Sequence, residues 1–146
     1  MSDFRRLSDQ FSASPQIDTG GVADAAARGF TTIVNNRPDG EVAGQPTGAA
    51  IEAEASAAGL SYHAIPVDHT GFTDAHIAAM AKVLDEADGK VLAYCRSGTR
   101  STLLWAVARA SRGDDPDQLA QAAKDAGYDL GPVRPSMEAL ANDRKG

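Results

Sequence analysis

The one cysteine of the 146-residue chain stands in a stretch whose residue types suit nucleophilic attack on an anion. A thiolate is a strong nucleophile, and nearby guanidinium groups stabilise it while they bind the oxygens of an anionic substrate. A lone cysteine is often only a small buried apolar residue. Here Arg96, Gly98 and Arg100 follow Cys95 closely. These neighbouring residues favour a catalytic cysteine, with Arg100 as the main ligand of the anion.

The elements around Cys95 must hold it at the edge of a sheet. Residues 91–94 are continuously apolar, as in a central parallel strand, and apolar residues repeat at helical spacing over residues 100–112. A strand, a loop and a helix in this order direct backbone N–H groups and the positive end of the helix dipole at the loop. Gly98 permits the necessary backbone bend, and the Ser101 or Thr99 hydroxyl can donate to the sulfur. The expected anion-binding residues are Arg96, Ser97, Gly98, Thr99 and Ser101.

Strands and helices alternate along the rest of the chain. Further strands are expected at residues 11–13, 30–35 and 62–67, and helices at residues 21–28, 51–58, 73–88, 116–126 and 135–141. Residues 36–48 are rich in glycine and proline and predict a loop. This alternation predicts an α/β fold, a mainly parallel sheet of four or five strands with helices on both faces. Ligands of such sheets bind at the carboxyl ends of the strands, where Cys95 falls.

Size and charge exclude several classes of function. With 146 residues and 42% hydrophobic content, residues 1–146 form one predicted domain, with its core over about residues 3–141. The net charge of −6 argues against nucleic-acid or anionic-membrane binding. No apolar run is long enough to span a bilayer and no secretory signal is evident, so we expect a cytoplasmic protein. The three histidines lack the spacing of a metal site, and we expect no metal and no cofactor.

Three further side chains are candidates for the same cleft. Asp68 follows a predicted strand and could serve as a general acid, although aspartate is common in turns for purely conformational reasons. His69 and Arg37 could also line the cleft, or could be a surface histidine and part of a turn. Arg96 could instead point outward and pair with a surface carboxylate.

Several separated motifs resemble the phosphatase-like domain of beta-lactamase-hydrolase-like proteins. The matching stretches are residues 94–101, 11–16, 32–41 and 126–130, and the resemblance spans roughly residues 3–141. It implies a fold similar to that of dual-specificity protein tyrosine phosphatases. Members of the family have been described both as phosphatases and as sulfurtransferases. The resemblance therefore implies a cysteine-dependent enzyme and leaves two reactions open.

Loop length bears on that choice. Phosphatases of the cysteine class place five residues between cysteine and arginine, whereas four separate Cys95 from Arg100. The loop matches the Cys-Arg-x-Gly-x-Arg pattern that is common in rhodanese sulfurtransferases. A tighter loop suits a sulfane sulfur on the cysteine better than a phosphoryl group. We therefore favour a sulfurtransferase that moves sulfur from thiosulfate or a persulfide through a Cys95 persulfide.

Two alternatives remain. In a phosphatase, Cys95 would form a phosphocysteine from a phosphate ester, Arg100 would bind the phosphate and Asp68 would supply the proton. In a non-catalytic persulfide or redox sensor, Cys95 would be persulfidated without turnover. The expected ligand is in each case a small anion. A separate persulfide-metabolising enzyme is a possible partner, because the family's domain is also found fused to a metallo-hydrolase-like domain.

Overall fold

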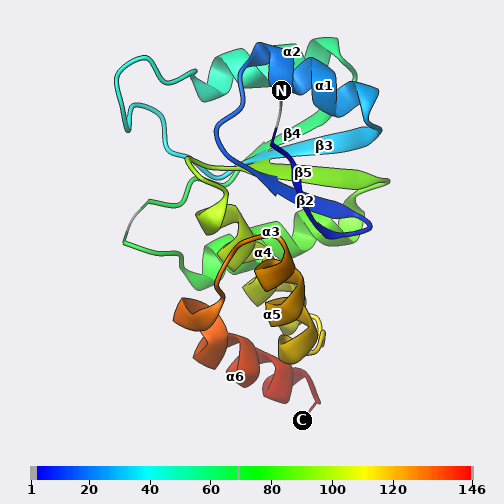
Figure 1. Cartoon of the computed structure of the whole chain (residues 1–146), viewed down its shortest axis with the longest axis vertical. Helices are drawn as coiled ribbons and strands as arrows, with labels where there is room; N and C mark the ends of the chain where they lie inside the picture. The colour runs from blue at the N-terminus through cyan, green and yellow to red at the C-terminus, as the bar shows by residue number, and fades with distance from the viewer. Residues whose placement is uncertain (1–2, 69, 146) are drawn as a thin grey trace.

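The protein is built on one twisted sheet in which an antiparallel edge strand joins four parallel ones (Figure 1). The computed structural model describes residues 3–68 and 70–145. The strands in spatial order are β1 (Arg5–Ser8), β2 (Phe11–Ser14), β5 (Lys90–Tyr94), β3 (Phe30–Asn35) and β4 (Ser61–Ala64). β1 pairs antiparallel with β2, and the other pairings are parallel. The carboxyl ends of β2, β5 and β3 therefore meet at one edge.

Helices cover both faces of this sheet. α1 (Thr19–Ala27) and α2 (Gly48–Ala57) lie on one face, and the remaining helices lie on the other (Figure 1). These are α3 (Asp74–Glu86), α4 (Thr99–Ser111), α5 (Pro116–Asp125) and α6 (Arg134–Lys145), with the short 3-10 helix η1 (Gly131–Val133) before α6. The parallel pairings require such crossovers.

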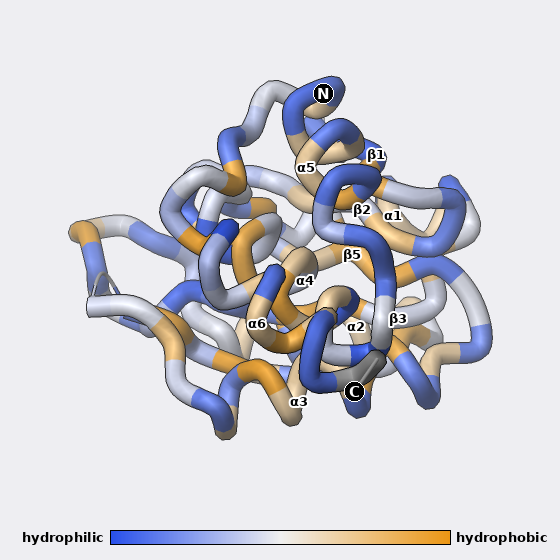
Figure 2. The backbone as a smooth tube through the Cα atoms, turned by 90° about the horizontal axis from the view of Figure 1, so that it is seen from below, coloured by the Kyte–Doolittle hydropathy of each residue, from blue (hydrophilic) through white to orange (hydrophobic). Residues whose placement is uncertain are grey.

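Two apolar cores result, because successive strand residues point to opposite faces. Leu92 and Tyr94 pack toward α1 and α2, whereas Val91 and Ala93 pack toward the helices of the other face. Trp105 of α4 stacks on Phe11, with ring centroids 5.6 Å apart. Figure 2 shows the apolar segments gathered around α4 and β5, with polar segments at the outer turns. α4 is thus a buried helix that packing against the sheet holds in place.

The predicted α/β sheet with helices on both faces is confirmed, and its differences from the prediction lie at its two edges. The prediction missed β1, because Leu7 is the one buried apolar residue of this edge strand. The strand predicted over residues 62–67 is wrong at its end, since β4 stops at Ala64. The N–H groups of Ile65 and Val67 still donate to the backbone carbonyls of Asn35 and Asn36, each at 2.9 Å. Pro66 has no N–H and cannot continue a ladder.

Candidate active site

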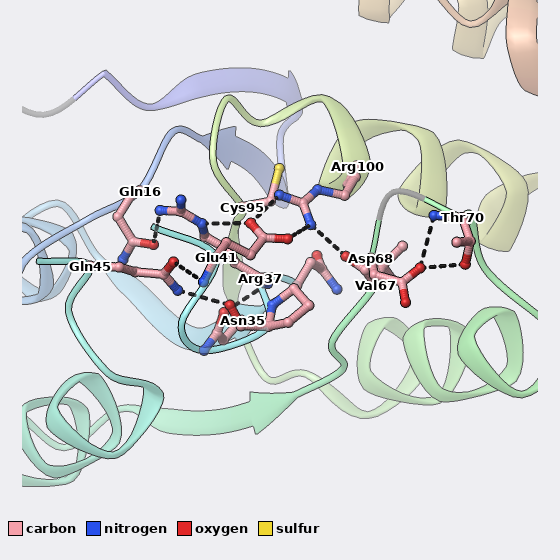
Figure 3. Close-up of polar contacts among 12 residues, drawn as sticks. Gln16, Asn35, Arg37, Glu41, Gln45, Val67, Asp68, Thr70, Cys95 and Arg100 are labelled. Atoms are coloured by element: carbon pink, nitrogen blue, oxygen red, sulfur yellow. Dashed lines mark hydrogen bonds and ion pairs between the residues drawn. The ribbon is translucent and has the colours of Figure 1, made fainter. Parts of the chain in front are cut away.

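Cys95 is held at the carboxyl edge of the sheet by backbone hydrogen bonds from both neighbouring strands. It directly follows β5, and its N–H donates to the Ser14 carbonyl at 3.3 Å. On the other side, the Asn36 N–H donates to the Tyr94 carbonyl at 2.8 Å. The segments that follow β2, β3 and β5 therefore converge, and they bring Gln16, Arg37 and Cys95 into one cluster (Figure 3).

The loop of residues 95–100, called the Cys95 loop below, turns a backbone donor toward the sulfur. Gly98 adopts a φ of +93°, a conformation that favours glycine, and its N–H donates to Cys95 Sγ at 3.1 Å. Gly98 is also the N-cap of α4, so the sulfur lies at the positive end of a long buried helix. Both features stabilise a thiolate. The Cys95 side chain is fully buried in this conformation.

Arg100 lies beside the sulfur, and a carboxylate holds its guanidinium in place (Figure 3). Its Nη1 and Nη2 donate to the two oxygens of Glu41 at 2.7 and 2.8 Å, and Nη1 also donates to the Val67 carbonyl at 2.6 Å. A guanidinium has five N–H groups in a fixed fork. The Nε–H and the second Nη2–H share one edge, and neither is used in these three bonds. Arg100 thus retains a two-pronged donor edge for an anion.

Glu41 also binds Arg37, so that one carboxylate links two guanidinium groups. Arg37 Nε donates to Glu41 Oε1 at 2.8 Å, and Arg37 Nη1 donates to Gln16 Oε1 at 3.1 Å. The Arg37 side chain is 4% exposed, and its buried Nη2 has no hydrogen-bond partner within residues 3–68 and 70–145. Hydrogen bonding to Arg100, and secondarily to Arg37, lowers the pKa of Glu41 to about 2. Glu41 therefore stays ionised and orients Arg100 at any ordinary pH.

The loop that carries Glu41, residues 36–47, is ordered by its own side chains and is called the Glu41 loop below. The Glu41 N–H donates to Gln45 Oε1 at 3.1 Å, and Gln45 Nε2 donates to the Pro38 carbonyl at 2.9 Å. Asp39 accepts from the Gly48 N–H at 2.8 Å, at the start of α2. Sequence reasoning placed a loop here and missed the role of Glu41. The available signal was a single glutamate in a turn-rich segment that follows a strand of the same sheet.

The remaining residues of the Cys95 loop form its rim. Arg96, Ser97 and Thr99 are exposed, and Ser97 Oγ donates to Thr99 Oγ1 at 3.0 Å. Ser101 is buried, and its hydroxyl donates to Asn36 Oδ1 at 2.8 Å. The expected hydrogen bond from Ser101 to the sulfur is therefore replaced by a bond that ties α4 to the end of β3.

Asp68 is exposed, and its carboxylate is engaged in its own turn. Asp68 Oδ1 accepts from the backbone N–H of Thr70 at 2.9 Å and also from the Thr70 hydroxyl. Figure 3 shows this carboxylate facing Thr70, on the side of Val67 away from the sulfur. His69, the other candidate from this segment, lies outside the described residues. Asp68 thus follows Val67, whose carbonyl binds Arg100, while the Asp68 carboxylate points toward Thr70.

Neither a metal site nor a membrane span is found in the part of the chain that the structure describes. There, histidine, cysteine, aspartate and glutamate side chains form no group of three or more that could hold a metal ion. Among the same residues, no helix has the length and apolar character needed to cross a membrane.

Comparison with known proteins identifies relatives over nearly the whole chain. A family model described as "Beta-lactamase hydrolase-like protein, phosphatase-like domain" matches residues 3–112. A beta-lactamase hydrolase-like protein of Xylella fastidiosa (strain 9a5c) is 36% identical over 129 residues, and one of Agrobacterium fabrum is 34% identical over 126 residues. Each match covers 86% of this chain and 29% of the relative. The chain therefore spans under a third of the length of these relatives.

Solved structures of phosphatases share the fold. A Neisseria meningitidis protein named as a candidate phosphatase superposes with a TM-score of 0.81 at 32% identity, covering 94% of this chain and 98% of that one. PTPMT1 has a TM-score of 0.73 at 14% identity, covering 98% and 99% of the two chains. At that identity the likeness shows the fold, which is protein-tyrosine-phosphatase-like. These comparisons support the phosphatase alternative better than the sulfurtransferase that loop length favours. The chain belongs to the family of phosphatase-like domains of beta-lactamase hydrolase-like proteins.

Proposed function

We propose that the protein is a sulfurtransferase in which Cys95 carries sulfane sulfur. The observation that carries this proposal is the short Cys95 loop, with four residues between Cys95 and Arg100 and the Gly98 N–H donating to the sulfur at 3.1 Å. A small cradle closed over a fully buried sulfur favours a donor that presents one protruding atom. The outer sulfur of thiosulfate or of a persulfide is such an atom.

The first half of the reaction transfers sulfur to the enzyme. The Cys95 thiolate attacks the outer sulfur of thiosulfate, and an S–S bond forms between Sγ and that sulfur. The bond to the sulfonate sulfur breaks, and sulfite leaves with the electron pair. The donor edge of Arg100 that Glu41 leaves unoccupied can bind the sulfonate oxygens and stabilise the charge that develops on them.

The second half of the reaction regenerates the thiolate. A nucleophilic acceptor, either cyanide or a second thiolate, attacks the outer sulfur of the Cys95 persulfide. The S–S bond breaks, and its electron pair returns to Cys95 as thiolate. The Gly98 N–H and the α4 N-terminus favour this anion as a leaving group. No general acid is needed in either half.

Phosphate-ester hydrolysis is the second candidate, and the protein-tyrosine-phosphatase-like fold favours it. In that reaction Cys95 attacks phosphorus, the ester oxygen leaves, and a general acid protonates it. Asp68 is the candidate acid, and its carboxylate would have to leave Thr70 to reach a leaving group. The hydrogen bonds of Asp68 therefore favour sulfur transfer, whereas the fold favours hydrolysis.

A parallel turnover assay tests the proposal. The wild-type protein and the Cys95→Ser variant are each assayed with thiosulfate plus cyanide and with an aryl phosphate. Sulfur transfer predicts thiocyanate that disappears in the variant, with phosphate release at background. Cysteine-dependent phosphate release without thiocyanate would establish the second candidate. A Cys95 persulfide that forms and never turns over would instead support the sensor function.

We also propose that the protein acts in the cytoplasm on a small anion, and that a separate persulfide-metabolising enzyme supplies that anion or accepts the transferred sulfur. The net charge of −6 and the local arginines support a small anion over a polyanion. The curated relatives extend well beyond this domain, which supports cooperation with another catalytic unit.

A further inference from the structure

Tyr128 contacts the Cys95 loop from the segment that follows α5. It follows α5, where Gly127 has a φ of +92° and the Tyr128 N–H donates to the Ala123 carbonyl at 2.8 Å. Its side chain is buried, and the Arg5 guanidinium lies over its ring, 5.1 Å from the centroid. A helix C-terminus and an edge strand therefore fix the ring between them.

The hydroxyl of this ring binds the peptide unit that serves the sulfur. Tyr128 Oη donates to the Ser97 carbonyl at 3.1 Å, and the Gly98 N–H donates to Cys95 Sγ at 3.1 Å. The Ser97 carbonyl and the Gly98 N–H belong to one planar trans peptide, so they point in opposite directions. Tyr128 and Cys95 thus hold the two ends of the same peptide. A hydrogen bond at the carbonyl end also polarises the N–H and strengthens its bond to the sulfur.

The packing around this peptide leaves little freedom for another arrangement. A Cβ added to Gly98 would lie 2.1 Å from Tyr128 Oη, so the ring rests directly against the glycine. Burial raises the pKa of Tyr128 and outweighs the opposing charge of Arg5, and negative charge on Cys95 also raises it. The hydroxyl therefore remains a donor wherever the Cys95 thiolate forms.

We propose that Tyr128 is a positioning residue that orients the Ser97–Gly98 peptide and so stabilises the Cys95 thiolate through the Gly98 N–H. This proposal rests on the proposed function only in taking Cys95 as the nucleophile. It predicts that loss of the Tyr128 hydroxyl makes the thiolate harder to form while the ring still fills its site.

The test is a pH titration of the thiolate in the wild type and in the Tyr128→Phe variant. Cys95 is the one cysteine in the chain, so ultraviolet thiolate absorbance, with Cys95→Ser as the blank, reads this residue alone. Tyr62→Phe is the matched control, because it also removes a hydroxyl in a hydrogen bond, to Asn35 at 3.0 Å. Thermal unfolding of both variants measures their structural cost.

We expect the titration midpoint of Tyr128→Phe to rise by about half to one pH unit, a threefold to tenfold loss of thiolate stability. Tyr62→Phe should keep the wild-type midpoint even if it unfolds at a lower temperature. A Tyr128→Phe midpoint equal to that of the wild type would overturn the proposal. The titration needs no substrate, so a raised midpoint without thiocyanate turnover in the wild type would refute the proposed function and leave this inference intact.

Discussion

Two loops meet at the carboxyl edge of the sheet, and they are ordered in different ways. The Cys95 loop is fixed largely by its backbone, through the Ser14 carbonyl, the Gly98 N–H and the start of α4. The Glu41 loop is fixed by side chains, through Gln45, Asp39 and the two arginines. The first loop presents the nucleophile, and the second orients Arg100 beside it. Substitutions in the Cys95 loop should therefore lower kcat/KM more than substitutions in the Glu41 loop.

The sharpest way to test this difference is to add the same methyl group to each loop. Gly98 and Gly40 both have positive φ, of +93° and +76°, so alanine is strained at both positions. A Cβ at Gly98 would collide with Tyr128, whereas a Cβ at Gly40 would meet nothing within 4 Å. We expect Gly98→Ala to lower kcat/KM for thiosulfate by at least about 100-fold.

Gly40→Ala is the control for this comparison. It should cost roughly 1 kcal/mol of unfolding free energy and leave kcat/KM within about threefold of the wild type. Chemical denaturation and steady-state kinetics measure the two quantities. Equal losses of activity in the two variants would mean that the backbone of the Cys95 loop has no special role.

The next effect concerns Arg100, the residue of the Cys95 loop that Glu41 binds. Arg100→Lys keeps the charge but removes the fork that binds Glu41 on one edge and leaves a second edge for the substrate. We expect kcat/KM to fall by about 10-fold to 100-fold, with thermal stability changed little, because the side chain is partly exposed. An unchanged kcat/KM would show that the Arg100 fork does not bind the reacting anion.

A smaller effect is expected at Glu41. Glu41→Gln keeps the shape of the side chain and loses the charge, so Arg100 is less firmly oriented, and we expect roughly a tenfold fall in kcat/KM. Glu52→Gln, an exposed glutamate of α2, is the matched control and should behave like the wild type. A higher kcat/KM in Glu41→Gln would mean instead that Glu41 competes with the substrate for Arg100.

Glu41 also makes a pH-dependent contribution to stability. Its pKa falls from 4.5 to about 2 in the folded protein, so its ionised form is favoured by folding. This contribution is fully present above pH 4.5 and is lost as the pH falls toward 2. The difference in unfolding free energy between wild type and Glu41→Gln should therefore shrink over that range. A difference that is constant between pH 6 and pH 2 would contradict the pairing.

The smallest effect is expected at Asp68, which the sulfur-transfer mechanism does not use. Asp68→Asn should leave thiocyanate formation within about twofold of the wild type, because neither half of the reaction needs an acid. In a phosphatase, removal of the general acid lowers kcat by roughly 10²-fold to 10⁴-fold. A large loss of aryl phosphate hydrolysis in Asp68→Asn would therefore favour the phosphatase.

The Cys95 loop could be predicted from the sequence because its determinants are local. The apolar strand, Gly98 and the start of α4 are neighbours in the chain, and hydrophobic periodicity predicts the elements on both sides. The same local signals predicted most of the sheet. They failed at β1, whose pairing with β2 compensates for a polar sequence.

Glu41 and Tyr128 could not be predicted in the same way, because their partners are distant in the chain. Glu41 is 59 residues from Arg100, and Tyr128 is 31 residues from Ser97. The turn-rich segment after β3 places Glu41 near this edge of the sheet, but only the tertiary structure shows that its partner is Arg100. Ser101 shows the opposite kind of error. Its closeness to Cys95 in the sequence predicted a hydrogen bond to the sulfur, but its hydroxyl donates to Asn36 instead.

Intact-mass spectrometry after incubation with thiosulfate is the most direct test of sulfur transfer through Cys95. We expect a mass increase of one sulfur atom in the wild type, which cyanide removes and which Cys95→Ser does not show. A wild-type mass that stayed unchanged with thiosulfate, while an aryl phosphate added a phosphoryl group to the same cysteine, would rule out sulfur transfer and establish a phosphatase.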